Sequence, residues 1–165
     1  MENALAPPDG LPLKLENLVA VWRAKCVDGR LPSRDDFTPR DLKPWLSNLA
    51  LLERIPEGGY RFRVCGTGLI PRFGCDTTGM AVEELTEELR IDLRNRLDRS
   101  STLQMPIVAC LQIPLALKCA DYSELILPLA NEAARVSMLL LATYPAPQTA
   151  FDPRRGLRAG ETWSD

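Results

Sequence analysis

The chain has 165 residues, of which 20 are lysine or arginine and 22 are aspartate or glutamate, so its formal net charge is −2. Hydrophobic residues make up 45% and charged residues 25%, a composition typical of one globular domain. The near balance of charge argues against a non-specific nucleic-acid binder. The sequence contains no histidine, which excludes histidine-dependent catalysis, histidine-ligated haem and zinc sites that use histidine.

The N-terminus lacks the basic and apolar regions of a signal peptide, and no stretch approaches 18 apolar residues. We therefore expect a cytoplasmic protein that does not insert into a membrane. The cysteines are odd in number and form no C-x-x-C motif, which disfavours a disulfide framework or a metal site. We expect most of them to be small buried hydrophobic residues; they are Cys26, Cys65, Cys75, Cys110 and Cys119.

Residues 1–12 hold three prolines and a glycine, which predicts a loose leader. Residues 13–28 follow with apolar side chains at helical spacing, which predicts an amphipathic helix. Two interpretations of its apolar stripe are open, because it can pack on the chain's own core or form a homodimer interface. The candidates for that interface are Leu15, Leu18, Val19 and Trp22.

Residues 49–55 and 60–66 each predict a strand, and the turn residues between them predict a hairpin. The second strand alternates between the two faces of a sheet. Its solvent face carries two arginines, and its inward face carries Tyr60, Phe62 and Val64.

Residues 82–97 predict a long helix, because apolar residues recur there at helical spacing. Glutamates gather in its first half and arginines toward its end, which suits the helix dipole. We interpret these charges, Arg94 and Arg96 among them, as a solvated face. The apolar stripe consists of Val82, Leu85, Leu89, Leu93 and Leu97.

Three further strands are predicted at residues 107–118, 123–130 and 135–144, the last apolar enough for a sheet interior covered on both faces. Residues 146–165 are predicted to be a peripheral tail. Helices and strands do not alternate as they do around a parallel sheet. The order therefore predicts one α+β domain over residues 13–145, with a five-stranded antiparallel sheet and helices on one face.

No catalytic constellation emerges from the sequence. Gly66-Thr67-Gly68 follows a predicted strand, but a dinucleotide-binding fingerprint needs a third glycine where this chain has Pro71. The paired carboxylates lie in polar segments, where burial is not expected to perturb them. We therefore predict no catalytic residue and no metal site.

Short segments occur in a specific order and spacing: Leu31-Pro32-Ser33-Arg34, Asp41-Leu42-Lys43-Pro44-Trp45-Leu46, Leu49-Ala50-Leu51-Leu52, residues 60–67, residues 73–79 and Leu125-Ile126-Leu127-Pro128-Leu129. In this order they resemble a PAS domain, and more narrowly a bacterial group of mostly stand-alone PAS proteins. The resemblance covers about residues 12–145.

This resemblance implies a five-stranded antiparallel sheet with helices between strands two and three, here with an extra N-terminal amphipathic helix. It also implies a non-catalytic bacterial sensory or signalling module that holds a small ligand between sheet and helices, mediates protein contacts, or does both. The residues expected to line the ligand pocket are Phe62, Val64, Leu69, Phe73, Leu85, Leu89, Met138 and Leu140.

The resemblance leaves the cofactor unknown. Histidine-ligated haem is excluded, and a photoactive flavin is disfavoured because no cysteine lies in an Asn-Cys-Arg-Phe context. We expect a homodimer that passes any signal to a separate protein partner, without a nucleic acid. Two alternatives stay open: a ligand-free adaptor or dimerisation module, and a small isomerase or dehydratase with a cone-shaped α+β fold.

Overall fold

A computed structural model of the chain describes residues 11–115 and 118–146. The predicted tail, after residue 146, and nearly all of the predicted leader lie outside these residues. In chain order the helices (α), 3-10 helices (η) and strands (β) are α1 (Leu13–Lys25), η1 (Arg34–Asp36), α2 (Pro39–Leu42), η2 (Lys43–Asn48), β1 (Leu49–Arg54), β2 (Tyr60–Cys65), η3 (Thr67–Leu69), α3 (Ile70–Phe73), η4 (Val82–Glu84), α4 (Glu87–Leu103), β3 (Ile107–Leu115), β4 (Lys118–Ala130) and β5 (Val136–Pro145).

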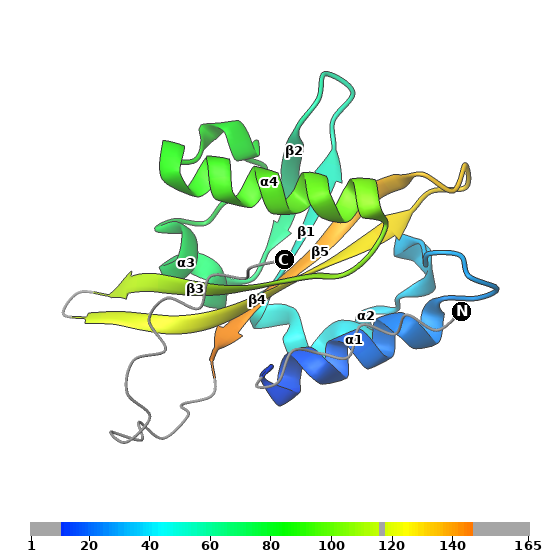
Figure 1. Cartoon of the computed structure of the whole chain (residues 1–165), viewed down its shortest axis with the longest axis horizontal. Coiled ribbons are helices and arrows are strands. Elements are labelled where there is room, and N and C mark those ends of the chain that lie inside the picture. Colours follow the sequence, from blue (N-terminus) through cyan, green and yellow to red (C-terminus); the bar gives the residue numbers. More distant parts are fainter. Residues whose placement is uncertain (1–10, 116–117, 147–165) are drawn as a thin grey trace, which may run out of the picture.

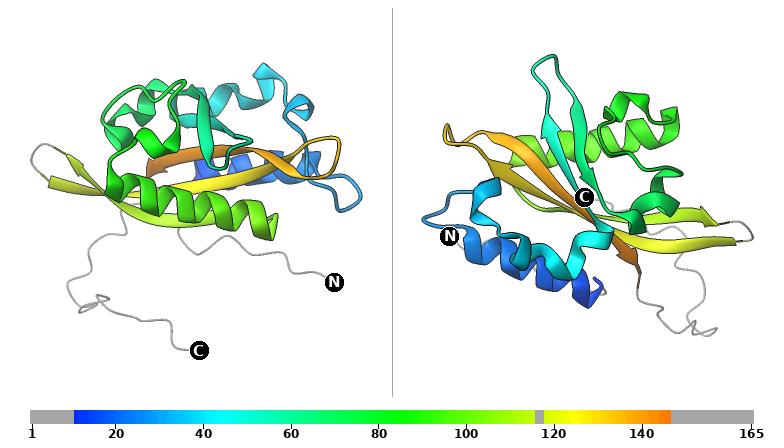
Figure 2. Two further views of the ribbon diagram at one scale, coloured as in Figure 1. Left: turned by 90° about the horizontal axis from the view of Figure 1, so that it is seen from above. Right: turned by 180° about the vertical axis from the view of Figure 1, so that it is seen from behind.

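The five strands form one antiparallel sheet in the order β2-β1-β5-β4-β3 (Figure 1). This confirms the predicted α+β class and the five-stranded antiparallel sheet. The helices between β2 and β3 pack on one face of the sheet, where α4 crosses the strands. The N-terminal helix α1, together with α2 and η2, packs on the opposite face (Figure 2).

The sheet therefore has a hydrophobic core on each side, and β5 contributes to both. Leu139 and Leu141 belong to the core beneath α3 and α4, which we call the α4-side core. Leu140 and Ala142 belong to the core beneath α1, which we call the α1-side core. Successive side chains of a strand point to opposite faces, so an apolar run suits a strand covered on both sides. The prediction of a doubly covered strand here is confirmed.

β2 departs from clean alternation at Arg63. Leu51 of β1 lies opposite Val64, and the next residue, Leu52, lies opposite Phe62, so Arg63 has no partner on β1. An extra residue of this kind is a β-bulge, and it moves the next side chain to the other face of the sheet. Val64 is therefore 54% exposed, whereas Phe62 is fully buried.

The helix predicted over residues 82–97 is two helices. η4 ends at Glu84, and the extended backbone of Leu85 (φ −70°, ψ 163°) separates it from α4. α4 starts at Glu87 and continues past the predicted end to Leu103, where Gln104 ends it with a positive φ of 54°. The spacing of the apolar side chains does not reveal the break, because Leu85 is buried in the α4-side core together with Leu93 and Leu97 of the helix.

The glycine pair after β2 has a packing role. A Cβ atom on Gly66 would lie 2.2 Å from the carbonyl oxygen of Leu46, and one on Gly68 would lie 2.6 Å from that of Ser47. Because no side chain fits at either distance, glycine lets the end of β2 lie directly against the backbone of η2. The Gly66-Thr67-Gly68 segment is thus a close turn off a strand.

Candidate functional site

The eight side chains expected to line a pocket do not share one layer. Phe62, Leu69, Phe73 and Leu85 are buried in the α4-side core, and Leu89 packs against its margin. The rings of Phe62 and Phe73 meet edge to face, with centroids 5.2 Å apart. The remaining three lie elsewhere, because the bulge exposes Val64, and the alternation of β5 places Met138 and Leu140 with the α1-side core.

A buried charged cluster lies in the same layer as the first group. The carboxylate of Glu124, on β4, is fully buried and contacts two arginines. Arg72 Nε, on α3, donates to Glu124 Oε2 over 3.3 Å, and Arg96 Nε, on α4, donates to Oε1 over 3.0 Å. Thr143 on β5 donates its hydroxyl to Oε2 over 3.4 Å. We call these four residues the Glu124 cluster.

Strand alternation explains why Glu124 faces the helices. Its neighbour Leu125 belongs to the α1-side core and Ile126 to the α4-side core, so Glu124 points toward α3 and α4. In the sheet, Glu124 lies opposite Thr143 on one side and Ala109 of β3 on the other. The cluster therefore ties both helical elements of this layer to one point on a central strand.

The Glu124 cluster holds more positive than negative charge. Arg72 and Arg96 keep only 7% and 13% of their side-chain surface exposed, and they share one carboxylate. Arg96 Nη2 lies 3.0 Å from Glu124 Oε1 but is poorly aligned, so this buried nitrogen has no hydrogen-bond partner in the described part of the chain. The Arg72 guanidinium also lies 5.2 Å from the centre of the Phe73 ring, in cation–π range. A buried excess cation is costly unless it is compensated.

A second polar link joins β2 to α4. Tyr60 is buried, and its hydroxyl donates to Asp98 Oδ1 over 2.7 Å and lies 3.1 Å from Ser101 Oγ. Burial, as the largest effect, raises the pKa of Tyr60 to about 12, and the hydrogen bond to Asp98 also raises it. Tyr60 thus stays neutral over the physiological range and works as a hydrogen-bond donor to α4.

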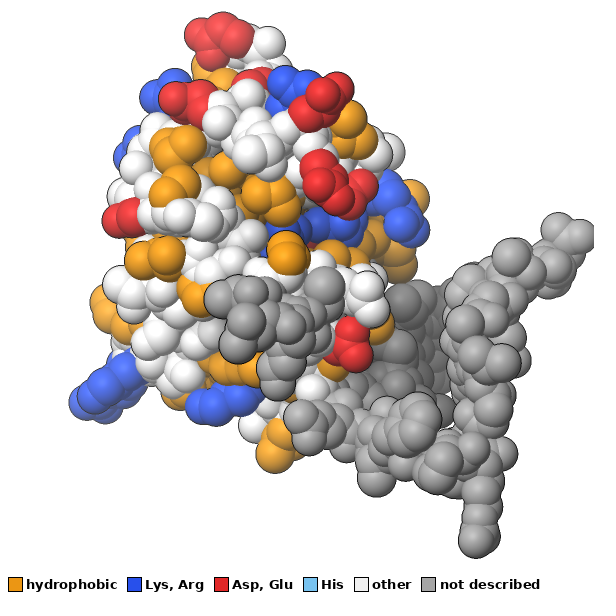
Figure 3. Space-filling view, turned by 90° about the vertical axis from the view of Figure 1, so that its left-hand side faces the viewer, with side chains coloured by type: hydrophobic (Ala, Val, Ile, Leu, Met, Phe, Trp, Pro, Cys, Tyr) orange, Lys and Arg blue, Asp and Glu red, His pale blue; other side chains and the backbone are white. Residues whose placement is uncertain are grey.

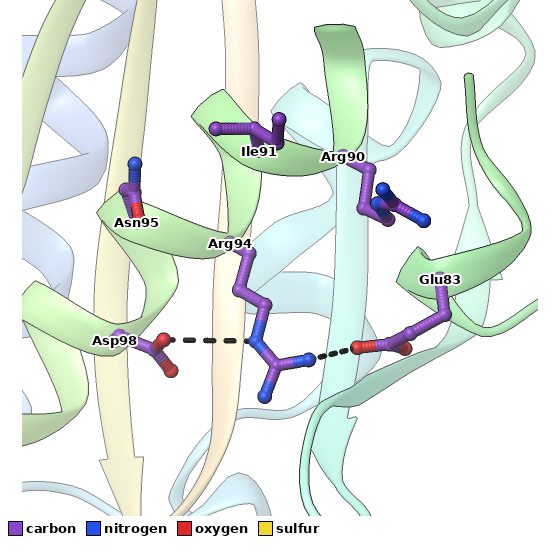
Figure 4. Close-up of a pocket in the computed structure, with 6 residues that line it drawn as sticks. All are labelled: Glu83, Arg90, Ile91, Arg94, Asn95 and Asp98. Carbon is purple, nitrogen blue, oxygen red and sulfur yellow. Dashed lines mark hydrogen bonds and ion pairs between the residues drawn. The ribbon is translucent and has the colours of Figure 1, made fainter. Parts of the chain in front are cut away.

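Two depressions on the surface lie away from the expected pocket residues. One, of about 320 Å³, lies between η4 and α4, where Arg94 forms ion pairs with Glu83 and Asp98 (Figure 4). The other, of about 580 Å³, lies between residues 25–36, the end of α4 and the β4–β5 turn. Neither is lined by any of the eight predicted pocket residues.

The four residues proposed for a homodimer interface are buried within the chain. Leu15 and Leu18 are fully buried, and Val19 and Trp22 keep 7% and 5% of their surface exposed. The indole nitrogen of Trp22 donates to the carbonyl oxygen of Pro128 on β4 over 2.9 Å. Of the two interpretations of this stripe, the structure shows packing on the chain's own core, so these side chains present no free surface to a second copy.

The expectation of buried cysteines needs correction. Cys75 and Cys110 are exposed, and Cys26 and Cys65 are partly buried, while the side chain of Cys119 lies outside the described residues. Among the described residues no cluster of cysteine, aspartate and glutamate could hold a metal ion. Among the described helices, none has the length and hydrophobicity of a membrane-spanning segment.

The residues of the Glu124 cluster were not predicted from the sequence. Arg96 was expected on a solvated helix face, whereas its side chain is largely buried on Glu124. Glu124 did carry a signal, since it is the single charge in the apolar strand predicted at residues 123–130. Its partners lie 28 and 52 residues away in the chain, so no local spacing could have paired them.

Comparison with known proteins identifies the family. The sequence matches the PAS domain family over residues 12–142, so the chain belongs to that family. PAS domains are generally non-catalytic sensory modules. No curated protein matches the sequence.

Several solved structures resemble this chain at low sequence identity. The PAS domain of Bordetella pertussis BvgS is 16% identical, with a TM-score of 0.49, over 66% of this chain and 83% of its own. A sensory box sensor histidine kinase from Vibrio cholerae is 17% identical, with a TM-score of 0.46, over 64% and 86%. The N-terminal domain of a diguanylate cyclase with a PAS/PAC sensor from Marinobacter aquaeolei is 9% identical, with a TM-score of 0.42, over 59% and 94%.

Proposed function

We propose that this PAS domain is a non-catalytic sensory module that binds a small organic acid between the sheet and the α3–α4 layer, at the Glu124 cluster. The observation that carries the proposal is that Arg72 and Arg96 share a single buried carboxylate. A ligand carboxylate would balance the excess charge and accept a hydrogen bond from Arg96 Nη2. Arginine suits this role because its planar fork matches a carboxylate.

The position of the cluster supports a signalling role. Arg72 belongs to α3 and Arg96 to α4, and both are held to β4 through Glu124. A ligand that competes with Glu124 for either arginine would loosen or shift that helix relative to the sheet. A ligand changes the population of two conformations only if it binds them unequally, and competition for a shared ion pair provides that difference. A separate protein partner would then respond to the shift.

Calorimetric titration and thermal melting of the full chain test this proposal. The ligands are a series of small mono- and dicarboxylic acids, each compared with its neutral amide. We expect one or more acids to bind and raise the melting temperature, because a ligand at 100 times its dissociation constant adds about 2.7 kcal/mol of stability. The amides should have no effect. The proposal is contradicted if no acid binds, or if an acid and its amide bind equally.

A variant that lacks the charged side chains of the Glu124 cluster tests whether the acid binds at this cluster. The triple substitution Arg72→Met, Glu124→Leu and Arg96→Met removes the whole cluster at once, and such replacements are often tolerated or stabilising. We expect this variant to fold and to lose acid binding. The matched control is Arg63→Met, which removes an exposed arginine of β2 and should bind as the wild type does.

A ligand-free adaptor is the second candidate, and the packing of the α4-side core favours it. Phe62, Leu69 and Phe73 fill with their own side chains the layer where a ligand was expected. Under this alternative the Glu124 cluster only fixes the helices, and the domain works through protein contacts. The titration separates the two functions, because the adaptor binds none of the acids.

A further inference from the structure

The two edges of the sheet are built differently. On the outer edge of β2, the amide of Phe62 donates to the carbonyl of Met80 over 2.9 Å, and Phe62 accepts from the amide of Gly79 over 2.8 Å. β2 is also six residues long, carries Arg61 and Arg63, and is bulged. Cover, charge and bulges are the devices that prevent an edge strand from pairing with another chain.

The opposite edge, β3, has no cover, charge or bulge within the described part of the chain, and its one edge-protecting residue is Pro114 near the end of the strand. Its nine residues pair with β4 in unbroken register, from Ile107 opposite Ile126 to Leu115 opposite Lys118. The strand contains no charged residue. No backbone hydrogen bond from any other described segment reaches its outer edge. Figure 1 shows β3 at the margin of the sheet. Figure 3 shows the molecule from the end at which the β3–β4 hairpin projects, where hydrophobic side chains lie among charged ones.

We propose that β3 pairs edge to edge with β3 of a second copy of this chain, antiparallel about a two-fold axis, so that two sheets join into one. The second copy is the occupant because an uncharged strand can face itself without repulsion, whereas two copies of β2 would bring their arginines together. A two-fold contact also closes on itself, and among the described strands the only edges left on the joined sheet are the two copies of β2, which are covered. The apolar stripe of α1, the candidate interface in the sequence, packs within the chain.

Pro114 sets the register of this pairing. Proline has no amide hydrogen, so a partner strand gains no hydrogen bond there. The stretch of β3 that can pair is therefore residues 107–113, and its central residue is Cys110. In a symmetric antiparallel pair the central residues face each other, so the exposed Cys110 side chains of the two copies meet at the axis. Facing residues of this kind lie within disulfide range.

Sedimentation velocity over a range of concentrations tests the interface. We expect a monomer–dimer equilibrium for the wild-type chain. Cys110→Lys should raise the dissociation constant about fivefold or more, because it places two like charges face to face. The matched control Val64→Lys adds a lysine at an exposed position of the covered edge and should leave the dimer unchanged. A wild type that stays monomeric, or a dimer that Cys110→Lys does not weaken, overturns the proposal.

Cross-linking tests the register. Diamide oxidises two facing thiols to a disulfide and takes up the two hydrogens, so we expect a covalent dimer from wild type and from Cys75→Ser but none from Cys110→Ser. A dimer that does not cross-link through Cys110 overturns this register. Amide hydrogen exchange provides a further check, since protection of β3 should rise with protein concentration. Complete protection at a concentration where sedimentation shows only monomer would mean that the chain covers its own edge, which also overturns the proposal.

Discussion

Glu124 should be costly to replace on its own, because it is the carboxylate that Arg72 and Arg96 share. The substitution Glu124→Gln keeps the shape but leaves Arg72 and Arg96 buried without a counter-charge. Breaking a buried ion pair in this way costs about 3–5 kcal/mol. Urea denaturation at neutral pH measures the loss.

The matched control for Glu124→Gln is Glu83→Gln, which breaks the partly exposed ion pair with Arg94. Exposed pairs contribute about 0–1 kcal/mol, so this variant should be nearly as stable as the wild type. If the two substitutions cost the same, Glu124 does not anchor the cluster as described.

Tyr60 gives the stability a pH dependence at the alkaline end. Burial raises the pKa of Tyr60 from 10 to about 12, so the folded chain keeps the phenolic proton over a range in which the unfolded chain releases it. The stabilisation is therefore complete below pH 10 and is lost as the pH rises from about 10 to 12. Unfolding measured across this range should show a steeper loss for wild type than for Tyr60→Phe. If the stability of wild type and of Tyr60→Phe falls equally with pH, the Tyr60 hydroxyl is not buried and hydrogen-bonded as described.

Among the elements, α1 should behave as part of the core. Trp22→Ala removes a side chain that fills the α1-side core and bonds to Pro128, so we expect a loss of about 3–5 kcal/mol. Leu13→Ala, on the same helix but 69% exposed, should change stability by no more than about 0.5 kcal/mol. Thermal or urea unfolding compares the two. A well-folded Trp22→Ala variant that only loses self-association would restore the helix as an interface.

The β4–β5 turn contains a local strain that glycine should relieve. Ala134 has a φ of 57°, a conformation that side chains disfavour and glycine adopts freely. Ala134→Gly should therefore stabilise the fold by up to about 1 kcal/mol. Ala133→Gly changes the adjacent alanine, which has no positive φ, and should stabilise nothing. If both substitutions change the free energy of unfolding equally, the backbone at Ala134 is not strained.

The elements also show what the sequence could predict. Alternation, apolar runs and helical spacing indicated all five strands and both long helices, because these patterns reflect which side chains are buried. β4, however, begins at Lys118 and not at residue 123 as predicted. The bulge at Arg63 escaped prediction, since it depends on the pairing with β1 and not on β2 alone. The break at Leu85 was not predicted, because its buried side chain continues the helical spacing although its backbone is extended.

In the whole molecule, the predicted pocket residues come together only where they lie on the same face of the sheet. The alternation of β5 sends Met138 and Leu140 to the face opposite Phe62 and Phe73, and the sequence alone does not reveal which face carries which helix. The same arrangement brings Arg72, Arg96 and Glu124 together from three distant elements. Side chains brought together only by the fold have no spacing signal, and this explains why the cluster was not predicted.

Native mass spectrometry of the freshly purified full chain shows whether the Glu124 cluster binds a small acid. The spectrum is compared with that of the denatured chain, for wild type and for the uncharged triple variant, after incubation with the acid that titration identifies. We expect an added mass on wild type that is released on denaturation and is missing from the triple variant. A bare wild-type mass, or equal binding by the triple variant, would mean that the Glu124 cluster does not bind the acid.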